Sequence, residues 1–144
     1  SGDQVVAIQT DIERIKNAIV FNPIIQTPAS KRMQAVGWAT QLNNIDDQVL
    51  LILIHTMNND PNTNVRLASI DALRSFAGKR EVRRIFIQAL AVQDDPLVQI
   101  SLIDALTELK EQEAINEMER LLTAESTHPE VKHRLIEGIA ELQM

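Results

Sequence analysis

The chain has 144 residues, a formal net charge of −6, 44% hydrophobic residues and only 3% aromatic residues. Its length fits one domain, and an acidic chain offers few of the cationic contacts that nucleic-acid backbones need. It contains no cysteine and no run of 18 apolar residues, which excludes disulfides, thiol catalysis and a membrane-spanning helix within this sequence.

The first expected element is an amphipathic helix within residues 1–22. Its apolar residues recur in steps of three and four, as a heptad-like seam does; they are Val5, Ile8, Ile12, Ile15 and Ile19. We interpret this segment as a helix that docks on the following domain and caps it, and that ends at Asn22-Pro23. The alternative is a stalk that forms a homodimer through residues 5–19 and leads to a membrane helix in a segment that this chain lacks.

Residues 23–144 form the second expected domain, which repeats with a period of 33 residues. Segments 65–73, 98–106 and 131–139 align at this offset, and their apolar residues follow helical spacing. A second set of apolar residues also repeats every 33 residues, at Val49, Val82 and Ile115. The pattern predicts an all-α fold, an α-solenoid of about four stacked helical hairpins with an extra N-terminal helix.

Proline marks the start of three repeats, at Asp60-Pro61, Asp95-Pro96 and His128-Pro129. Proline fits the first turn of a helix, and an aspartate before it can cap the free N–H groups. The expected helices cover residues 30–42, 47–58, 63–76, 80–92, 97–110, 112–124 and 129–142. The first repeat aligns only at an offset of 34 and carries Trp38 where Ala72 stands, so we expect a divergent end repeat with Trp38 in its core.

The run Asp60-Pro61-Asn62-Thr63-Asn64-Val65-Arg66-Leu67-Ala68, followed by Asp71-Ala72-Leu73, resembles HEAT repeats of the bacterial variety. The resemblance covers residues 28–142 and departs at Gln99 and Lys132, where the family favours arginine. It implies a curved α-solenoid that binds other macromolecules, and it implies no specific chemistry.

A narrower resemblance starts from Ala35-Val36-Gly37-Trp38 and continues through the repeat at residues 64–76 and the segment 96–104. These runs resemble the C-terminal HEAT domain of bacterial membrane-anchored proteins that carry a zinc-finger-like anti-sigma segment and one transmembrane helix. The resemblance implies a sensing or docking domain of an envelope regulator on the extracytoplasmic, periplasmic side of the inner membrane. The alternative location is the cytoplasm.

Two sets of residues are candidates for binding a protein partner. Arg80, Arg83 and Arg84 follow Lys79 at a helix N-terminus, where the helix dipole disfavours cations, which suggests an anionic partner. The alternative is a solvated face that the acidic repeat next to it neutralises. HEAT repeats line their concave face with second helices, and the outward positions there include Leu51, Arg84, Gln88 and Glu117.

Asp71, Asp104 and Glu137 occupy equivalent positions and predict a structural ladder, in which cations such as Arg66, Arg74 or Lys132 interleave. The alternative is an acidic stripe for a basic partner.

No catalytic or phosphate-binding motif is present, and His128 and His133 lack the spacing of a zinc pair. We therefore expect no enzyme activity, metal, cofactor or small-molecule substrate. A nucleic-acid-binding HEAT-like protein is a further alternative, which the acidic charge and the few aromatics disfavour.

Overall fold

The computed structural model describes residues 28–144, and the chain divides into two compact units, Ser1–Ser75 and Phe76–Met144. The expected N-terminal helix 1–22 and its seam at residues 5–19 lie outside the described residues. Within residues 28–144 every regular element is helical, so the predicted all-α fold built of repeated hairpins is confirmed.

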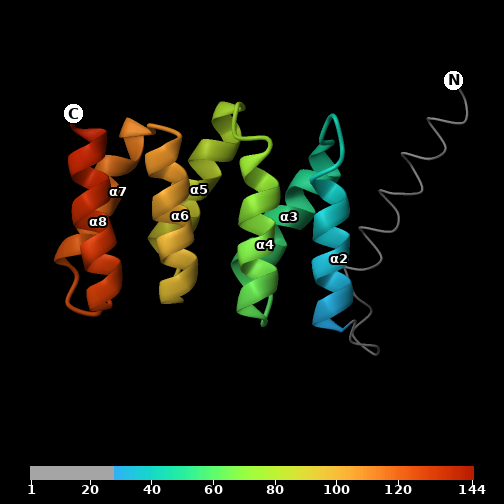
Figure 1. Cartoon of the computed structure of the whole chain (residues 1–144), viewed down its shortest axis with the longest axis horizontal. Helices are drawn as coiled ribbons and strands as arrows, with labels where there is room; N and C mark the ends of the chain where they lie inside the picture. Colours follow the sequence, from blue (N-terminus) through green and yellow to red (C-terminus); the bar gives the residue numbers. More distant parts are fainter. Residues whose placement is uncertain (1–27) are drawn as a thin grey trace, which may run out of the picture. The chain divides into compact units, whose positions relative to one another are not determined.

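Unit 1 contains α2 (Ala29–Ala39), α3 (Asp47–Asn59) and α4 (Thr63–Arg74), and α4 packs against both other helices (Figure 1). The apolar stripe of α3, with Val49, Leu53 and Met57, is fully buried. Asp46 is the N-cap of α3, since its side chain accepts a hydrogen bond from the N–H of Val49 at 2.8 Å.

Unit 2 contains α5 (Arg80–Val92), α6 (Pro96–Glu108), a 3₁₀ turn η1 (Gln112–Ala114), α7 (Ile115–Thr123) and α8 (Pro129–Leu142). These helices form two layers, with α6 beside α8 and α5 beside α7 (Figure 1). Each layer contributes its apolar stripe to one core, whose largest fully buried side chains are Phe86, Leu90, Leu102, Ile103, Leu106, Met118 and Leu135. The repeat period therefore has a direct structural meaning, since each period adds one helix to each layer.

The helices expected at 80–92 and 129–142 are observed with the same bounds. The bounds of the other helices differ from the expected ones by three residues or fewer at either end. The helix expected at 112–124 starts as a 3₁₀ turn before α7 begins. The helix at 129–142 packs on both α6 and α7. No helix among residues 28–144 is both long and apolar enough to cross a membrane.

Two local expectations were wrong. Trp38 is half-buried, and the buried positions of α2 are the smaller Ala35, Val36 and Ala39. Asp60 does not cap α4, because Asn62 takes that role by accepting from the N–H of Val65 at 3.2 Å. The expected arrangement does hold at α6, where Asp95 accepts from the N–H of Leu97 at 2.9 Å.

Candidate interaction surfaces

Arg83, one residue of the basic cluster, is committed to the structure of unit 2. Its Nε donates to Oε2 of Glu111 at 2.9 Å, and its Nη1 donates to the carbonyls of Ala77 at 2.8 Å and Gly78 at 3.1 Å. The Arg83 and Glu111 side chains are both partly buried. Arg83 therefore ties the turn before α5 to the segment after α6, and its guanidinium is occupied by these contacts.

The two neighbouring arginines differ from Arg83 in exposure and from each other in pairing. Arg80 Nη2 donates to Oε1 of Glu113 at 2.9 Å, in an ion pair that is open to solvent on both sides. Arg84 is exposed and forms no ion pair with a carboxylate of residues 28–144. The acidic segment at residues 111–113 thus balances two of the three arginines, and Arg84 remains available to a partner.

The outward positions of the second helices also divide into free and engaged side chains. In unit 1, Leu51 is 64% exposed on α3. In unit 2, Arg84 and Gln88 are exposed on α5, whereas Glu117 on α7 accepts from Arg120 Nε at 2.8 Å. The hydrogen bond and the charge of Glu117 raise the pKa of the Arg120 guanidinium. Glu117 is therefore already paired within its own helix.

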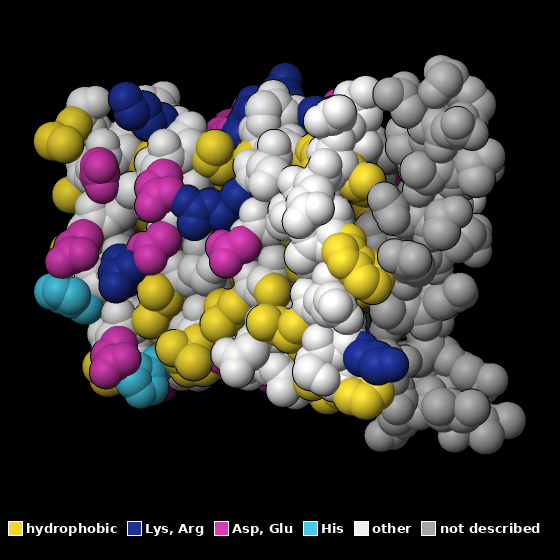
Figure 2. Space-filling model, turned by 45° about the vertical axis from the view of Figure 1, so that its right-hand side comes forward, with side chains coloured by type: hydrophobic (Ala, Val, Ile, Leu, Met, Phe, Trp, Pro, Cys, Tyr) yellow, Lys and Arg dark blue, Asp and Glu magenta, His cyan; other side chains and the backbone are white. Residues whose placement is uncertain are grey.

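The carboxylates of the expected ladder lie in different surroundings. In unit 2, Asp104 pairs with Arg134 across α6 and α8, and this hydrogen bond and the charge of Asp104 raise the pKa of the guanidinium. Glu137 lies 3.0 Å from His133 Nε2 and 4.0 Å from Arg134 Nε. The cation between Asp104 and Glu137 is thus Arg134 and not Lys132. Figure 2 shows acidic and basic side chains interspersed on the visible face.

Asp71 and Arg66, the two ladder residues of unit 1, do not form the expected ion pair with each other. Asp71 is exposed on α4. Arg66 donates from Nε to the carbonyl of Met57 at 3.0 Å, which ties α4 to the C-terminal turn of α3. A carbonyl there has no partner within its own helix, so Arg66 stabilises the end of α3.

The family model described as HEAT repeats matches residues 50–140 of the chain, from the first turn of α3 to the last turn of α8. The chain belongs to the HEAT-repeat family. No curated protein and no solved structure matches it. The matched span holds every candidate partner and ladder residue, so these positions all lie on HEAT hairpins.

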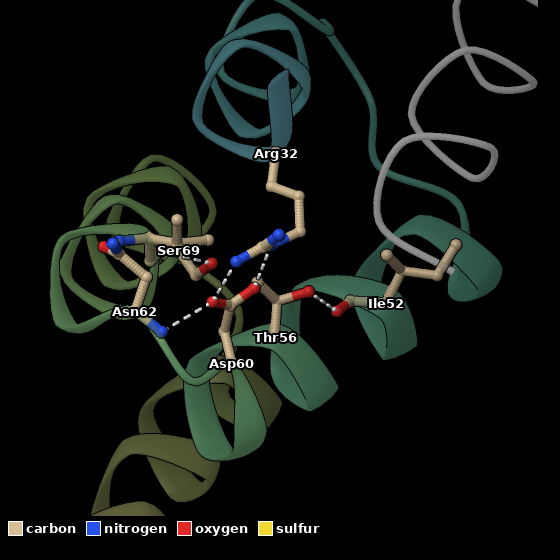
Figure 3. A network of polar contacts seen from close by, with 7 residues as sticks. Arg32, Ile52, Thr56, Asp60, Asn62 and Ser69 are labelled. Atoms are coloured by element: carbon tan, nitrogen blue, oxygen red, sulfur yellow. Dashed lines mark hydrogen bonds and ion pairs between the residues drawn. The ribbon is translucent and has the colours of Figure 1, made fainter. Parts of the chain in front are cut away.

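Sequence reasoning missed a largely buried ion pair between Arg32, which precedes the HEAT match, and Asp60, which lies within it (Figure 3). Arg32 donates from Nε to Oδ2 at 2.7 Å and from Nη2 to Oδ1 at 3.0 Å, a bidentate pair whose side chains are 13% and 5% exposed. Oδ1 of Asp60 also accepts from the N–H of Asn62 at 2.9 Å. The pair fastens α2 to the turn between α3 and α4.

The HEAT hairpins show no arrangement of side chains suited to a metal. Within residues 28–144 no group of three or more histidine and carboxylate side chains could hold an ion. His133 faces Glu137, and His128 accepts from the N–H of Glu130 at 3.2 Å through Nδ1. Both contacts serve α8, the second as its N-cap.

Proposed function

We propose that this HEAT-repeat chain is a non-catalytic scaffold that binds a protein partner through the exposed faces of its second helices. HEAT repeats are commonly protein-interaction scaffolds. The observation that carries the proposal is that Leu51 projects to solvent from α3, and Arg84 and Gln88 from α5, while each helix buries its opposite face in the core of its own unit. Such side chains sit on preformed helices, so a partner can bind them with little change in the backbone.

The chemistry of these positions indicates what the partner must offer. Leu51 presents an apolar side chain, which can enter a pocket of a partner, and Arg84 presents a cation that no described carboxylate neutralises. Arginine is enriched among the residues that dominate binding energy at interfaces. We therefore expect an apolar contact at α3 and an acidic contact at α5.

The experiment is a pull-down from an envelope extract with the immobilised chain and single variants. Arg84→Glu and Leu51→Asp change the proposed surface, whereas Lys31→Glu reverses an exposed charge on a first helix and serves as the matched control. Arg83→Glu is avoided because it would place two carboxylates together and disturb the fold. A protein retained by the wild type and by Lys31→Glu, and lost with the other two, is the expected result. Equal retention by all four proteins would contradict the proposal.

We further propose that the scaffold is the extracytoplasmic domain of a membrane-anchored bacterial envelope regulator. The support is the resemblance of residues 35–38, 64–76 and 96–104 to that group of proteins. The test is protease treatment of intact spheroplasts that produce the natural protein with an epitope tag at its C-terminus. Loss of the tag without lysis is expected, and protection of the tag until lysis would favour the cytoplasmic alternative.

A further inference from the structure

Unit 2 contains a cleft of about 610 Å³ that the proposed second-helix surface does not use. One wall is formed by the end of α5 and the loop that leads to α6, and the other by the end of α7 and the loop that leads to α8. Its volume lies in the range of clefts that bind small molecules or short segments of chain. The cleft lies between two loops of the same kind, one period apart.

Buried polar side chains hold both walls in place. Gln99 donates from Nε2 to the carbonyl of Gln93 at 2.8 Å, and Thr127 donates from Oγ1 to the carbonyl of Leu121 at 2.6 Å. Gln93, Gln99 and Thr127 have polar side chains. These three residues and Leu121 are each at least nine-tenths buried. Each loop is thus fixed to its own helix end, so the cleft is preformed, which reduces the entropy cost of filling it.

The cleft carries uncompensated negative charge. Asp94 lines one wall and Glu125 the other, both are exposed, and neither pairs with a cation of residues 28–144. Arg120 also lines the cleft, but its charge is offset by the hydrogen bond to Glu117. His128 lines the wall that holds Glu125, and its Nδ1 is occupied by the hydrogen bond that it accepts from the N–H of Glu130. The charge that remains favours a cationic occupant.

Two exposed apolar residues stand next to lining residues of the cleft in the sequence. Val92 is 74% exposed and Leu97 is 57% exposed, and they flank the lining residues Gln93, Asp94 and Pro96 in the sequence. We propose that this cleft binds a segment of a partner protein that carries an arginine or lysine next to an apolar residue. The cation lies between the walls that hold Asp94 and Glu125, and the apolar side chain packs against Val92 or Leu97. This inference rests on the proposed scaffold function and gives it a second contact.

The test is an NMR titration of the isotope-labelled full chain with the peptide Ac-Leu-Arg-Leu-NH2, and in parallel with Ac-Leu-Gln-Leu-NH2. We expect saturable shifts of the backbone amides around residues 93–97 and 124–128 with the arginine peptide and at least threefold weaker binding of the glutamine peptide. Raising the salt from about 50 to about 300 mM should weaken only the arginine peptide, because the contact is an exposed ion pair.

The variant Asp94→Asn/Glu125→Gln should bind the arginine peptide about fivefold to tenfold more weakly. The matched control, Glu81→Gln/Glu119→Gln, removes two exposed carboxylates of unit 2 outside the cleft and should bind like the wild type. Equal binding of both peptides, or equal binding by both double variants, would overturn the inference. If the peptides do not bind but Arg84→Glu still abolishes partner capture, the scaffold function stands and only the cleft assignment fails.

Discussion

Gly138 is the position at which one added methyl group tests the packing of unit 2 most directly. It lies inside α8, and a methyl group on it would lie 2.8 Å from Met118 Cε, 2.8 Å from Thr107 Oγ1 and 3.4 Å from Ile103 Cγ2. Carbon atoms in contact normally stand about 3.5–4.0 Å apart. The close approach of α8 to α6 and α7 therefore depends on the absence of a side chain at residue 138.

Two opposing effects decide what Gly138→Ala does to stability. Alanine favours a helix interior over glycine by about 1 kcal/mol. Overpacking a core costs about 1–3 kcal/mol. Met118 can rotate its terminal methyl group away, but the buried Thr107 hydroxyl donates to the Ile103 carbonyl at 2.7 Å, and moving it weakens a hydrogen bond worth about 1 kcal/mol. We expect Gly138→Ala to lower the free energy of unfolding by about 1–3 kcal/mol.

The matched control is Gly37→Ala in α2, where nothing lies within 4 Å of the position that the methyl group would take. The helix-propensity gain is then unopposed, and the free energy of unfolding should rise by about 0.5–1 kcal/mol. Both variants are measured by urea denaturation of the full chain, followed by far-UV circular dichroism. The same chemical change should thus have opposite signs at the two sites.

A double variant separates steric conflict from other causes. Thr107→Ala removes the oxygen that the new methyl group would meet, so Gly138→Ala/Thr107→Ala should be more stable than the sum of the two single effects predicts. An increase in stability on Gly138→Ala as large as that on Gly37→Ala would refute the reasoning, because it would mean that the helices are not in close contact at residue 138.

Three further predictions concern polar contacts, each read from urea denaturation. Asp60→Asn removes the carboxylate charge that pairs with the largely buried Arg32 guanidinium and should lower the free energy of unfolding by about 3 kcal/mol, whereas Asp71→Asn at an exposed position should change it by less than about 0.5 kcal/mol. Asp95→Ala removes the N-cap of α6 and should cost about 1 kcal/mol, with faster hydrogen exchange of the first amides of that helix. Arg83→Met should cost about 2 kcal/mol and Arg84→Met close to nothing; equal effects would mean that Arg83 is an ordinary surface charge.

The sequence predicts the helices of this chain well because burial decides them. Val49, Val82 and Ile115 are spaced by one period, and the first two are fully buried while the third starts α7. A polar residue at such a position would leave the core incomplete. The spacing of the apolar residues therefore predicts where the helices lie. Helix ends depend on single hydrogen bonds instead, which explains the differences of a few residues at the other bounds.

Asp60 shows where local pattern reasoning reaches its limit. Asp60-Pro61 and Asp95-Pro96 are the same dipeptide before the first helices of two consecutive repeats, yet only the second supplies an N-cap. The difference is that Asn62 offers α4 another cap and Arg32, 28 residues away, binds the Asp60 carboxylate. Nothing in the dipeptide indicates a partner on a helix of the preceding repeat, because that contact exists only once the helices have packed.

The basic cluster presents the same difficulty within one turn of helix. Arg83 and Arg84 are adjacent and chemically identical, but consecutive residues of an α-helix point about 100° apart. That rotation directs Arg83 toward Glu111 and the turn before α5, while Arg84 faces solvent. The sequence identified the cluster and both of its interpretations, and only the packed hairpins distinguish the residue that stabilises the fold from the residue that a partner can reach.

The positions that we propose for partner binding are those at which the residue type changes from one repeat to the next. Val65, Val98 and Val131 stand one period apart and are identical and fully buried, because each must fill an equivalent place in the core. Leu51, Arg84 and Glu117 stand at the same spacing and are apolar, cationic and anionic. Packing does not constrain the exposed Leu51 and Arg84, so a HEAT repeat can change such residues without altering its core. Substitutions at the first set should therefore change stability, and substitutions of Leu51 or Arg84 should change binding alone.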